Sequence, residues 1–171
     1  PTRYRDAIFL CDWTFATMYA MHLKPDGSSY KGKVDTFVTN TDGSLALTDV
    51  DIGPDGHMYF CVGGRKGQSY LYRVRYVGDE STELSPLDTS SEHYQARKTR
   101  HKIEAFHGKS NPKAIETVWS YLSSDDYHLR YAARIAIEWQ DPKIWAGKAY
   151  SEKDDLAAIH ALLGLARCDL E

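Results

Sequence analysis

The feature that most constrains the fold of this chain is an abrupt change of composition near residue 78. Residues 1–78 contain no glutamate, eight aspartates and nine of the twelve glycines. Residues 79–171 contain every glutamate and twelve of the sixteen alanines. Asp and Gly favour turns, whereas Glu and Ala favour helices. The sequence therefore predicts an α+β chain with antiparallel β hairpins over 1–78, a polar linker over 79–97 and helices over 98–171.

The first part consists of short apolar runs separated by turn signals. Pro-Asp-Gly occurs at 25–27 and again at 54–56. Proline presets φ for a turn and glycine accepts positive φ, so both sites predict tight turns. Phe9-Leu10-Cys11 and Tyr59-Phe60-Cys61 are similar and lie 50 residues apart. Short strands that recur at this spacing are typical of β-propeller blades.

The second part carries a helical repeat. Pro112-Lys113 and Pro142-Lys143 begin two units 30 residues apart, and apolar residues follow each at helical spacing. Ser124 or Asp125 is the expected N-cap of the helix that follows residue 126. Tyr127, Tyr131 and Trp139 are expected to pack in the core or between repeats. The pattern over 111–168 resembles HEAT repeats, which are helix pairs stacked into a solenoid.

Taken together, the two parts resemble a known family. The stretches 4–10, 18–23 and 48–60 are similar to the last blades of the six-bladed propeller of glucose/sorbosone dehydrogenase-like proteins. Large dehydrogenase-like proteins of planctomycete-type bacteria follow such a propeller with HEAT repeats, and 62–65, 71–74, 104–107 and 130–134 resemble that group. The resemblance implies about one and a half blades of the six here, a periplasmic or exported parent protein and sugar oxidation as the parent activity.

The resemblance does not extend to the quinone cofactor. Quinone-dependent members use a lysine and two arginines to hold the carboxylates of pyrroloquinoline quinone. Alignment through the Pro-Asp-Gly turn places Thr14, Ala46 and Thr48 at those positions. Without these cations the anionic cofactor loses its charge-assisted contacts, so quinone chemistry by this chain alone is not expected. No firm cofactor is predicted.

Several carboxylates and one arginine are candidates for chemistry. Asp49, Asp51 and Asp55 surround a turn, and oxygen ligands suit Ca²⁺; roles in the turn and on one strand face are the alternative. Asp12 is a catalytic candidate beside Trp13, although a strand end with a packed indole explains the same residues. Asp49 and Arg65 are the other catalytic candidates. Arg65 lies in the glycine-containing loop 63–67, which resembles an anion-binding loop or, more simply, a hairpin tip.

Histidines and cysteines give no clear site. The seven histidines are scattered among the expected elements, which favours structural or solvated roles. Cys11, Cys61 and Cys168 lack the spacing of metal ligands. Cys11 and Cys61 hold equivalent positions in successive blade-like units, farther apart than the ~7 Å between Cα atoms that a disulfide permits. Three free thiols are therefore expected.

Charge and hydropathy exclude two partner classes and leave three functions. A net charge of -3 disfavours a general nucleic-acid binder, and the apolar runs are far shorter than the ~20 residues of a membrane span. The first function is a sugar dehydrogenase-like propeller fragment, and the second is a calcium-dependent hydrolase of lactones. The third is a non-enzymatic interaction module. A lone blade exposes faces that neighbours normally cover, so self-association or assembly with the rest of a larger propeller is expected.

Overall fold

The computed structural model describes residues 1–41, 45–64 and 66–168. Within these ranges it has two three-stranded antiparallel sheets followed by five α-helices, which confirms the expected mixture of α and β structure. The chain divides into two compact units. We call residues 1–24 and 31–87 the β unit, and residues 25–30 and 88–171 the helical unit.

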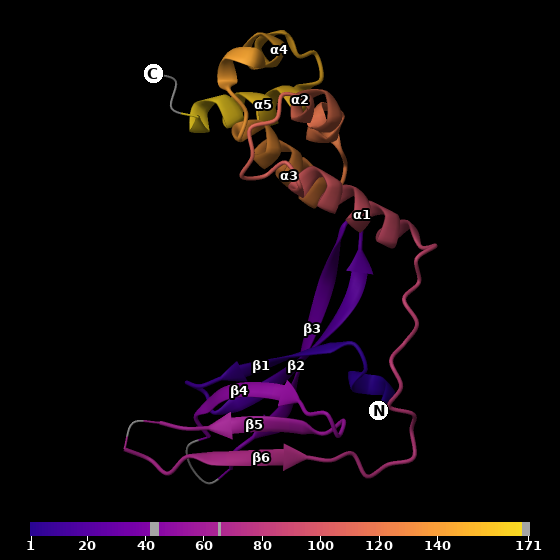
Figure 1. The fold of residues 1–171 in the computed structure, drawn as a ribbon, viewed down its shortest axis with the longest axis vertical. Coiled ribbons are helices and arrows are strands. Elements are labelled where there is room, and N and C mark those ends of the chain that lie inside the picture. The colour runs from indigo at the N-terminus through magenta and orange to yellow at the C-terminus, as the bar shows by residue number, and fades with distance from the viewer. Residues whose placement is uncertain (42–44, 65, 169–171) are drawn as a thin grey trace. The chain divides into compact units, whose positions relative to one another are not determined.

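The β unit contains both sheets, and in each sheet the strands are neighbours in sequence order. The first sheet consists of β1 (Ala7–Asp12), β2 (Thr17–Asp26) and β3 (Ser29–Thr39). The second consists of β4 (Leu47–Ile52), β5 (Met58–Val62) and β6 (Tyr70–Val74), with β5 in the middle (Figure 1). The turn at 54–56 follows β4 as the Pro-Asp-Gly signal predicts, whereas Pro25 and Asp26 lie in β2 and the first turn begins at Gly27.

One small apolar core serves both sheets. Met18, Leu47 and Phe60 are buried in it, and Phe9 from β1 and Val50 from β4 pack at its margin. Alternation along a strand sends every second side chain to the opposite face. On those other positions large apolar side chains stay exposed, among them Ile8, Leu10 and Leu71.

The helical unit is built from α1 (Glu92–Glu104) and two shorter helical pairs. The first pair is α2 (Lys113–Val118), extended by a 3₁₀ turn over Trp119–Ser123, with α3 (Tyr127–Glu138). The second is α4 (Ala146–Ser151), preceded by a 3₁₀ turn over Pro142–Ile144, with α5 (Asp155–Arg167). The helix α1 begins at Glu92, inside the range in which the sequence predicts a linker.

A continuous core joins these helices. It includes the fully buried Trp145, Ile137 and Leu122, and Trp119 meets Trp145 edge to face with ring centroids 6.4 Å apart. Small residues let the helices approach closely: the Trp145 ring would lie 3.4 Å from a Cβ added to Gly164. Packing of one apolar face per helix therefore accounts for the order of this unit.

The cap of α3 differs from the expectation. Ser124 or Asp125 was expected there, but the N-cap is Asp126, whose carboxylate accepts from the amides of His128 at 2.8 Å and Leu129 at 3.2 Å. Three candidate residues in a row cannot be separated by sequence preference, because all three side chains can accept such bonds. The burial of Leu129 in the first turn fixes the register instead.

Asp126 also holds a turn that is distant in sequence. Residues 25–30, which form the tip of the β2–β3 hairpin, belong to the helical unit. The Ser28 amide donates to Asp126 at 2.5 Å and the Ser28 hydroxyl donates at 2.9 Å. Gly27 has φ +53°, and a Cβ at this position would overlap the Asp126 carboxylate. A glycine is thus required here both by conformation and by space.

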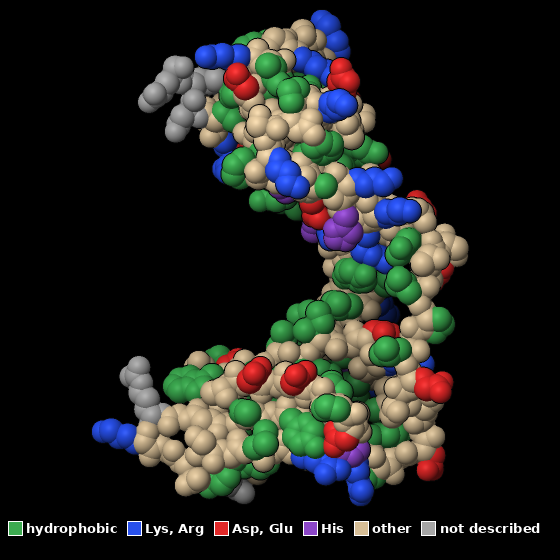
Figure 2. All heavy atoms as spheres, in the orientation of Figure 1, with side chains coloured by type: hydrophobic (Ala, Val, Ile, Leu, Met, Phe, Trp, Pro, Cys, Tyr) green, Lys and Arg blue, Asp and Glu red, His purple; other side chains and the backbone are tan. Residues whose placement is uncertain are grey.

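Apolar side chains reach the surface of each unit (Figure 2). Tyr127, Tyr131 and Trp139 are 59%, 47% and 54% exposed, so the expectation that they pack in the core is wrong. The two tyrosines lie on α3 and Trp139 directly follows it, while the buried face of this helix is formed mainly by alanine, leucine and isoleucine. In the described part of the chain, no helix has both the length and the apolar character that crossing a bilayer requires.

Candidate anion-binding site

The stem of the β2–β3 hairpin concentrates positive charge on one of its faces. His22 and Lys24 are two residues apart on β2, and Lys31, Lys33 and Asp35 follow the same period on β3. Residues at this period share one face of a strand. Like charges on neighbouring strands repel each other, so an anion placed among them would be stabilising.

Asp35 organises the base of this face. Its Oδ2 lies 2.6 Å from Nη2 of Arg3 and 3.0 Å from Nε2 of His22. Arg3 comes from the 3₁₀ turn over Thr2–Tyr4, so three separate segments meet at one carboxylate oxygen. These bonds join side chains 32 and 13 residues apart in sequence.

An aromatic cluster packs against Arg3 and His22. The Tyr4 ring lies 5.8 Å from the His22 ring and 5.0 Å from the Phe37 ring, which it meets edge on. Phe9 packs against Phe37 at 4.8 Å, and the Arg3 guanidinium lies 5.4 Å from the centre of the Tyr4 ring. Such contacts restrict side-chain rotation and therefore preorganise Arg3 and His22.

These contacts shift the pKa values of Asp35 and Arg3 in opposite directions. The hydrogen bond from Arg3, followed by the charges of Arg3 and His22, holds the pKa of Asp35 below its usual value. The same bond to Asp35 raises the pKa of Arg3. Asp35 is thus a carboxylate at neutral pH, and it orients Arg3 without pairing with Lys24 or Lys33.

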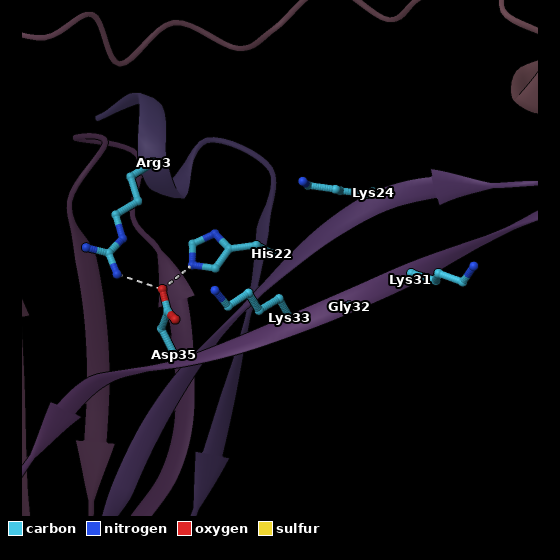
Figure 3. A pocket seen from close by; sticks show the side chains of 7 residues that line it. All are labelled: Arg3, His22, Lys24, Lys31, Gly32, Lys33 and Asp35. Carbon is cyan, nitrogen blue, oxygen red and sulfur yellow. Dashed lines mark hydrogen bonds and ion pairs between the residues drawn. The ribbon is translucent and has the colours of Figure 1, made fainter.

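These residues line a pocket of about 370 Å³, shown in Figure 3. Its lining consists of Arg3, His22, Lys24, Lys31, Gly32, Lys33 and Asp35. Four permanent cations face one carboxylate, so the pocket carries a positive excess. Lys24, Lys31 and Lys33 are exposed and end in donors only. Guanidinium and ammonium groups bind carboxylates and phosphates, so the arrangement is suited to binding an anion.

A second hollow, of about 440 Å³, lies in the helical unit. It is lined by Ile135, Glu138, Trp139, Pro142, Arg167 and Cys168. Glu138 is paired with Arg167 at 3.1 Å, so the two lining charges offset each other. This hollow therefore gives a weaker indication of ligand chemistry.

The carboxylates predicted as site candidates accept hydrogen bonds from backbone amides close to them in sequence. Asp12 accepts from the amides of Thr14 at 3.0 Å and Phe15 at 2.9 Å, which closes the turn after β1. Asp49 and Asp51 each accept from the amide of the next residue. Trp13 is 57% exposed, so the packed indole that the sequence offered as the alternative beside Asp12 is not found.

Asp55 is held more tightly within its turn. It accepts from the His57 amide at 3.1 Å and from the Tyr59 hydroxyl at 2.8 Å. The Tyr59 bond is the main reason why the pKa of Asp55 is lowered, and the same bond raises the pKa of Tyr59. Among the described residues, no three His, Cys, Asp or Glu side chains are grouped so that they could hold a metal ion. A calcium site at Asp49, Asp51 and Asp55 stays a prediction from the sequence.

The remaining candidates have different outcomes. Arg65 lies outside the described residues. Ala46 is buried, and the Thr48 hydroxyl donates to the carbonyl of Cys61 at 3.3 Å. Thr14 lies in the turn after β1, where its amide donates to Asp12 at 3.0 Å.

None of the pocket residues is among the candidates predicted from the sequence. His22 is one of the scattered histidines, and the spacing of Lys31, Lys33 and Asp35 predicts only that they share a strand face. This spacing does not by itself predict a site, because an alternating charged strand face is usually in contact only with solvent. No protein-family model, curated protein or solved structure was found to match the chain.

Proposed function

We propose that this chain is a non-redox binding segment of a glucose/sorbosone dehydrogenase-like propeller protein with HEAT-like repeats, and that it binds a small anion. The observation that carries the binding function is the pocket in which Asp35 fixes Arg3 and His22 beside Lys24 and Lys33. The ligand is a sugar acid or another compound with a carboxylate or phosphate group. These anions are the partners that guanidinium and ammonium groups recognise best.

The β unit supports the propeller part of the proposal. Each sheet is an antiparallel meander of three consecutive strands, and one core joins the two sheets. Propeller blades are antiparallel sheets of consecutive strands that pack face against face. Cys11 lies on the first strand of its sheet and Cys61 on the middle strand of the other, so the expectation that they hold equivalent positions is wrong and the sequence repeat adds nothing to the proposal.

The helical unit supports the HEAT-like part. Two helical pairs follow Pro112 and Pro142, and the second helix of each pair is capped by an aspartate, Asp126 in α3 and Asp154 in α5. The core runs through both pairs, as stacking of repeats requires. The α3 and α5 helices pair in the same direction, since Arg167 near the end of α5 meets Glu138 at the end of α3.

The binding proposal is tested by calorimetric titration of the whole chain with three probes. Sodium gluconate supplies a carboxylate on a sugar chain, inorganic phosphate supplies the alternative anion, and glucose is the neutral control. Binding of gluconate or phosphate, without glucose, is expected. Tighter binding of one anion identifies the chemical class of ligand, whereas no anion binding, or glucose binding as well as gluconate, overturns the proposal.

A matched pair of variants locates the binding. Lys33→Gln removes one cation from the pocket and should weaken anion binding by about three- to tenfold, because a solvent-exposed charge contact contributes modestly. Lys153→Gln makes the same change in the helical unit and should leave binding unchanged. Equal weakening by both variants would mean that only net charge matters. Addition of pyrroloquinoline quinone should produce no bound-cofactor absorbance in either protein.

A further inference from the structure

Two lysines lie next to each other across the strands of the anion pocket. The bond of 3.0 Å between His22 Nε2 and Asp35 Oδ2 shows that these two residues share one face of the β2–β3 hairpin. Two residues nearer the turn on each strand, the same face carries Lys24 and Lys33 (Figure 3). Same-face neighbours on antiparallel strands have Cβ atoms roughly 5–8 Å apart, so the two ammonium groups can contact one small anion.

The chain supplies no carboxylate to this pair of lysines. Asp35 is the only carboxylate among the residues that line the pocket, and its Oδ2 is bonded to Arg3 and His22. Both lysines are exposed, and no ion pair joins either of them to a carboxylate among the described residues. Like charges at neighbouring positions of a sheet are destabilising, so an anion between them would be favoured.

The kind of cation indicates which anion fits. A guanidinium is a planar fork that matches a carboxylate, and the Arg3 guanidinium is already bonded to Asp35 through Nη2 at 2.6 Å. An ammonium group is a compact charge with three donors, and lysine binds phosphate in this way. A phosphate monoester carries about two negative charges above its second pKa of about 6, together with three acceptor oxygens. Two lysines therefore match a phosphoryl group better than a single carboxylate.

We infer that the pocket binds a small phosphate monoester, with its phosphoryl group between Lys24 and Lys33. This inference rests on the proposed function, and it selects one of the anion classes named there. The phosphoryl oxygens accept hydrogen bonds from both ammonium groups. Asp35 repels the phosphoryl group from the base of the pocket, where Arg3 and His22 hold the carboxylate. The ester group faces the open side of the pocket, because both lysines are exposed.

Calorimetric titration of the whole chain with three matched sugars tests the inference. Glucose 6-phosphate, glucose 6-sulfate and glucuronate carry their anionic group on the same carbon of the ring. At pH 8 the phosphate has two charges, the sulfate has the same tetrahedral shape with one, and the carboxylate is planar with one. Glucose 6-phosphate should bind about fivefold or more tightly than either of the others, because its second charge is attracted by both lysines. Low salt is needed, since exposed charges are screened.

A matched pair of variants assigns the preference to the lysines. Lys24→Gln should weaken the binding of glucose 6-phosphate by about three- to tenfold. It should also reduce the preference for glucose 6-phosphate over glucose 6-sulfate, because only one lysine then attracts the second charge. Lys153→Gln, at an exposed position of the helical unit, should change neither quantity. Circular dichroism of both variants should match the unchanged protein, since both substitutions are on the surface.

The outcomes separate this inference from the proposed function. If glucuronate or glucose 6-sulfate binds as tightly as glucose 6-phosphate, the pocket is an anion site without a phosphate preference, and the inference alone is overturned. A phosphate preference that Lys24→Gln leaves unchanged also overturns it, because the phosphoryl group then lies elsewhere. Absence of binding by all three anions overturns both the inference and the proposed function.

Discussion

The two units differ in how completely they bury their own apolar side chains. Among the described residues, the shared core of the helical unit contains fifteen buried hydrophobic residues, and that of the β unit contains six. Each helix presents one apolar stripe that its neighbours cover, whereas each sheet has two faces and only one of them meets the shared core. The β unit thus depends less on its core and more on hydrogen bonding, turns and polar clusters.

The difference bears on function. The small β core ends partway along β2 and β3, and the anion pocket lies on the same strand faces beyond it, since His22 shares a β2 face with the buried Met18. In the helical unit, small residues such as Ala133 fill the inward stripe, and Tyr127 and Tyr131 stay exposed outside it.

The largest expected effect is the loss of a buried indole from the helical core. Trp145→Ala should destabilise this unit by about 3–5 kcal/mol, because it removes a fully buried side chain and leaves a cavity. Urea unfolding followed by circular dichroism at 222 nm measures the change. Trp139→Ala, at a 54% exposed position, is the control and should cost less than about 1 kcal/mol. Equal costs at the two positions would contradict the contrast between a filled core and an exposed surface.

The next effect concerns the carboxylate that serves both a helix and a turn. Asp126→Ala removes the N-cap of α3 and both bonds from Ser28, and should cost about 2–3 kcal/mol. Asp125→Ala, one residue earlier and exposed, should change stability by less than about 0.5 kcal/mol. The same unfolding measurement decides between them. Similar losses from the two variants would show that general charge near the helix start, rather than these bonds, is responsible.

The pH dependence of Asp126 gives a smaller and more specific effect. Burial alone would raise the pKa of this carboxyl, but the bonds from Ser28, Leu129 and His128 lower it on balance. A lowered folded pKa means that the stabilisation is complete above the unfolded value of about 3.9 and is lost as the pH falls through the folded pKa. The stability difference between the unchanged protein and Asp126→Asn should be constant from pH 5 to 8 and shrink below about pH 4.

Urea midpoints recorded for both proteins across that pH range provide the measurement. Other titrating groups affect the two proteins alike, so they cancel in the difference. A difference that stays unchanged down to pH 3 would exclude a role for the ionised carboxylate.

The helical part of the fold could be predicted closely from the sequence, and the reason is local. Ala132, Ala133, Ala136 and Ile137 follow helical spacing, and the structure buries all four. The expectation about the tyrosines failed because the same spacing cannot tell the last buried position from the first exposed one. Small alanines fill the interface between helices, which leaves Tyr127 and Tyr131 outside.

The candidate site could not be predicted in the same way. Asp35 meets Arg3 only because a 3₁₀ turn near the start of the chain lies beside β3, and no local pattern encodes that meeting. The carboxylates that the sequence did select are near turns, where aspartate is frequent for structural reasons. Asp12 and Asp55 illustrate this, since both accept backbone amides within their own turns.

The smallest expected effect separates the three cysteines by their rates of reaction. All three are free, and Cys61 is exposed whereas Cys11 and Cys168 are partly buried. Burial, with a smaller contribution from the charge of Asp49, raises the pKa of the Cys11 thiol. The thiolate is the reactive form, so Cys11 should react more slowly than Cys61 with a thiol reagent at pH 8.

Thiol labelling without reductant provides the measurement. Three groups should react in denaturant, and Cys61 should be labelled first in the folded protein, as mass spectrometry of partially labelled protein would show. Labelling of Cys11 before Cys61 would mean that the margin of the β core opens readily, and a single reactive group in denaturant would indicate a disulfide between the two sheets.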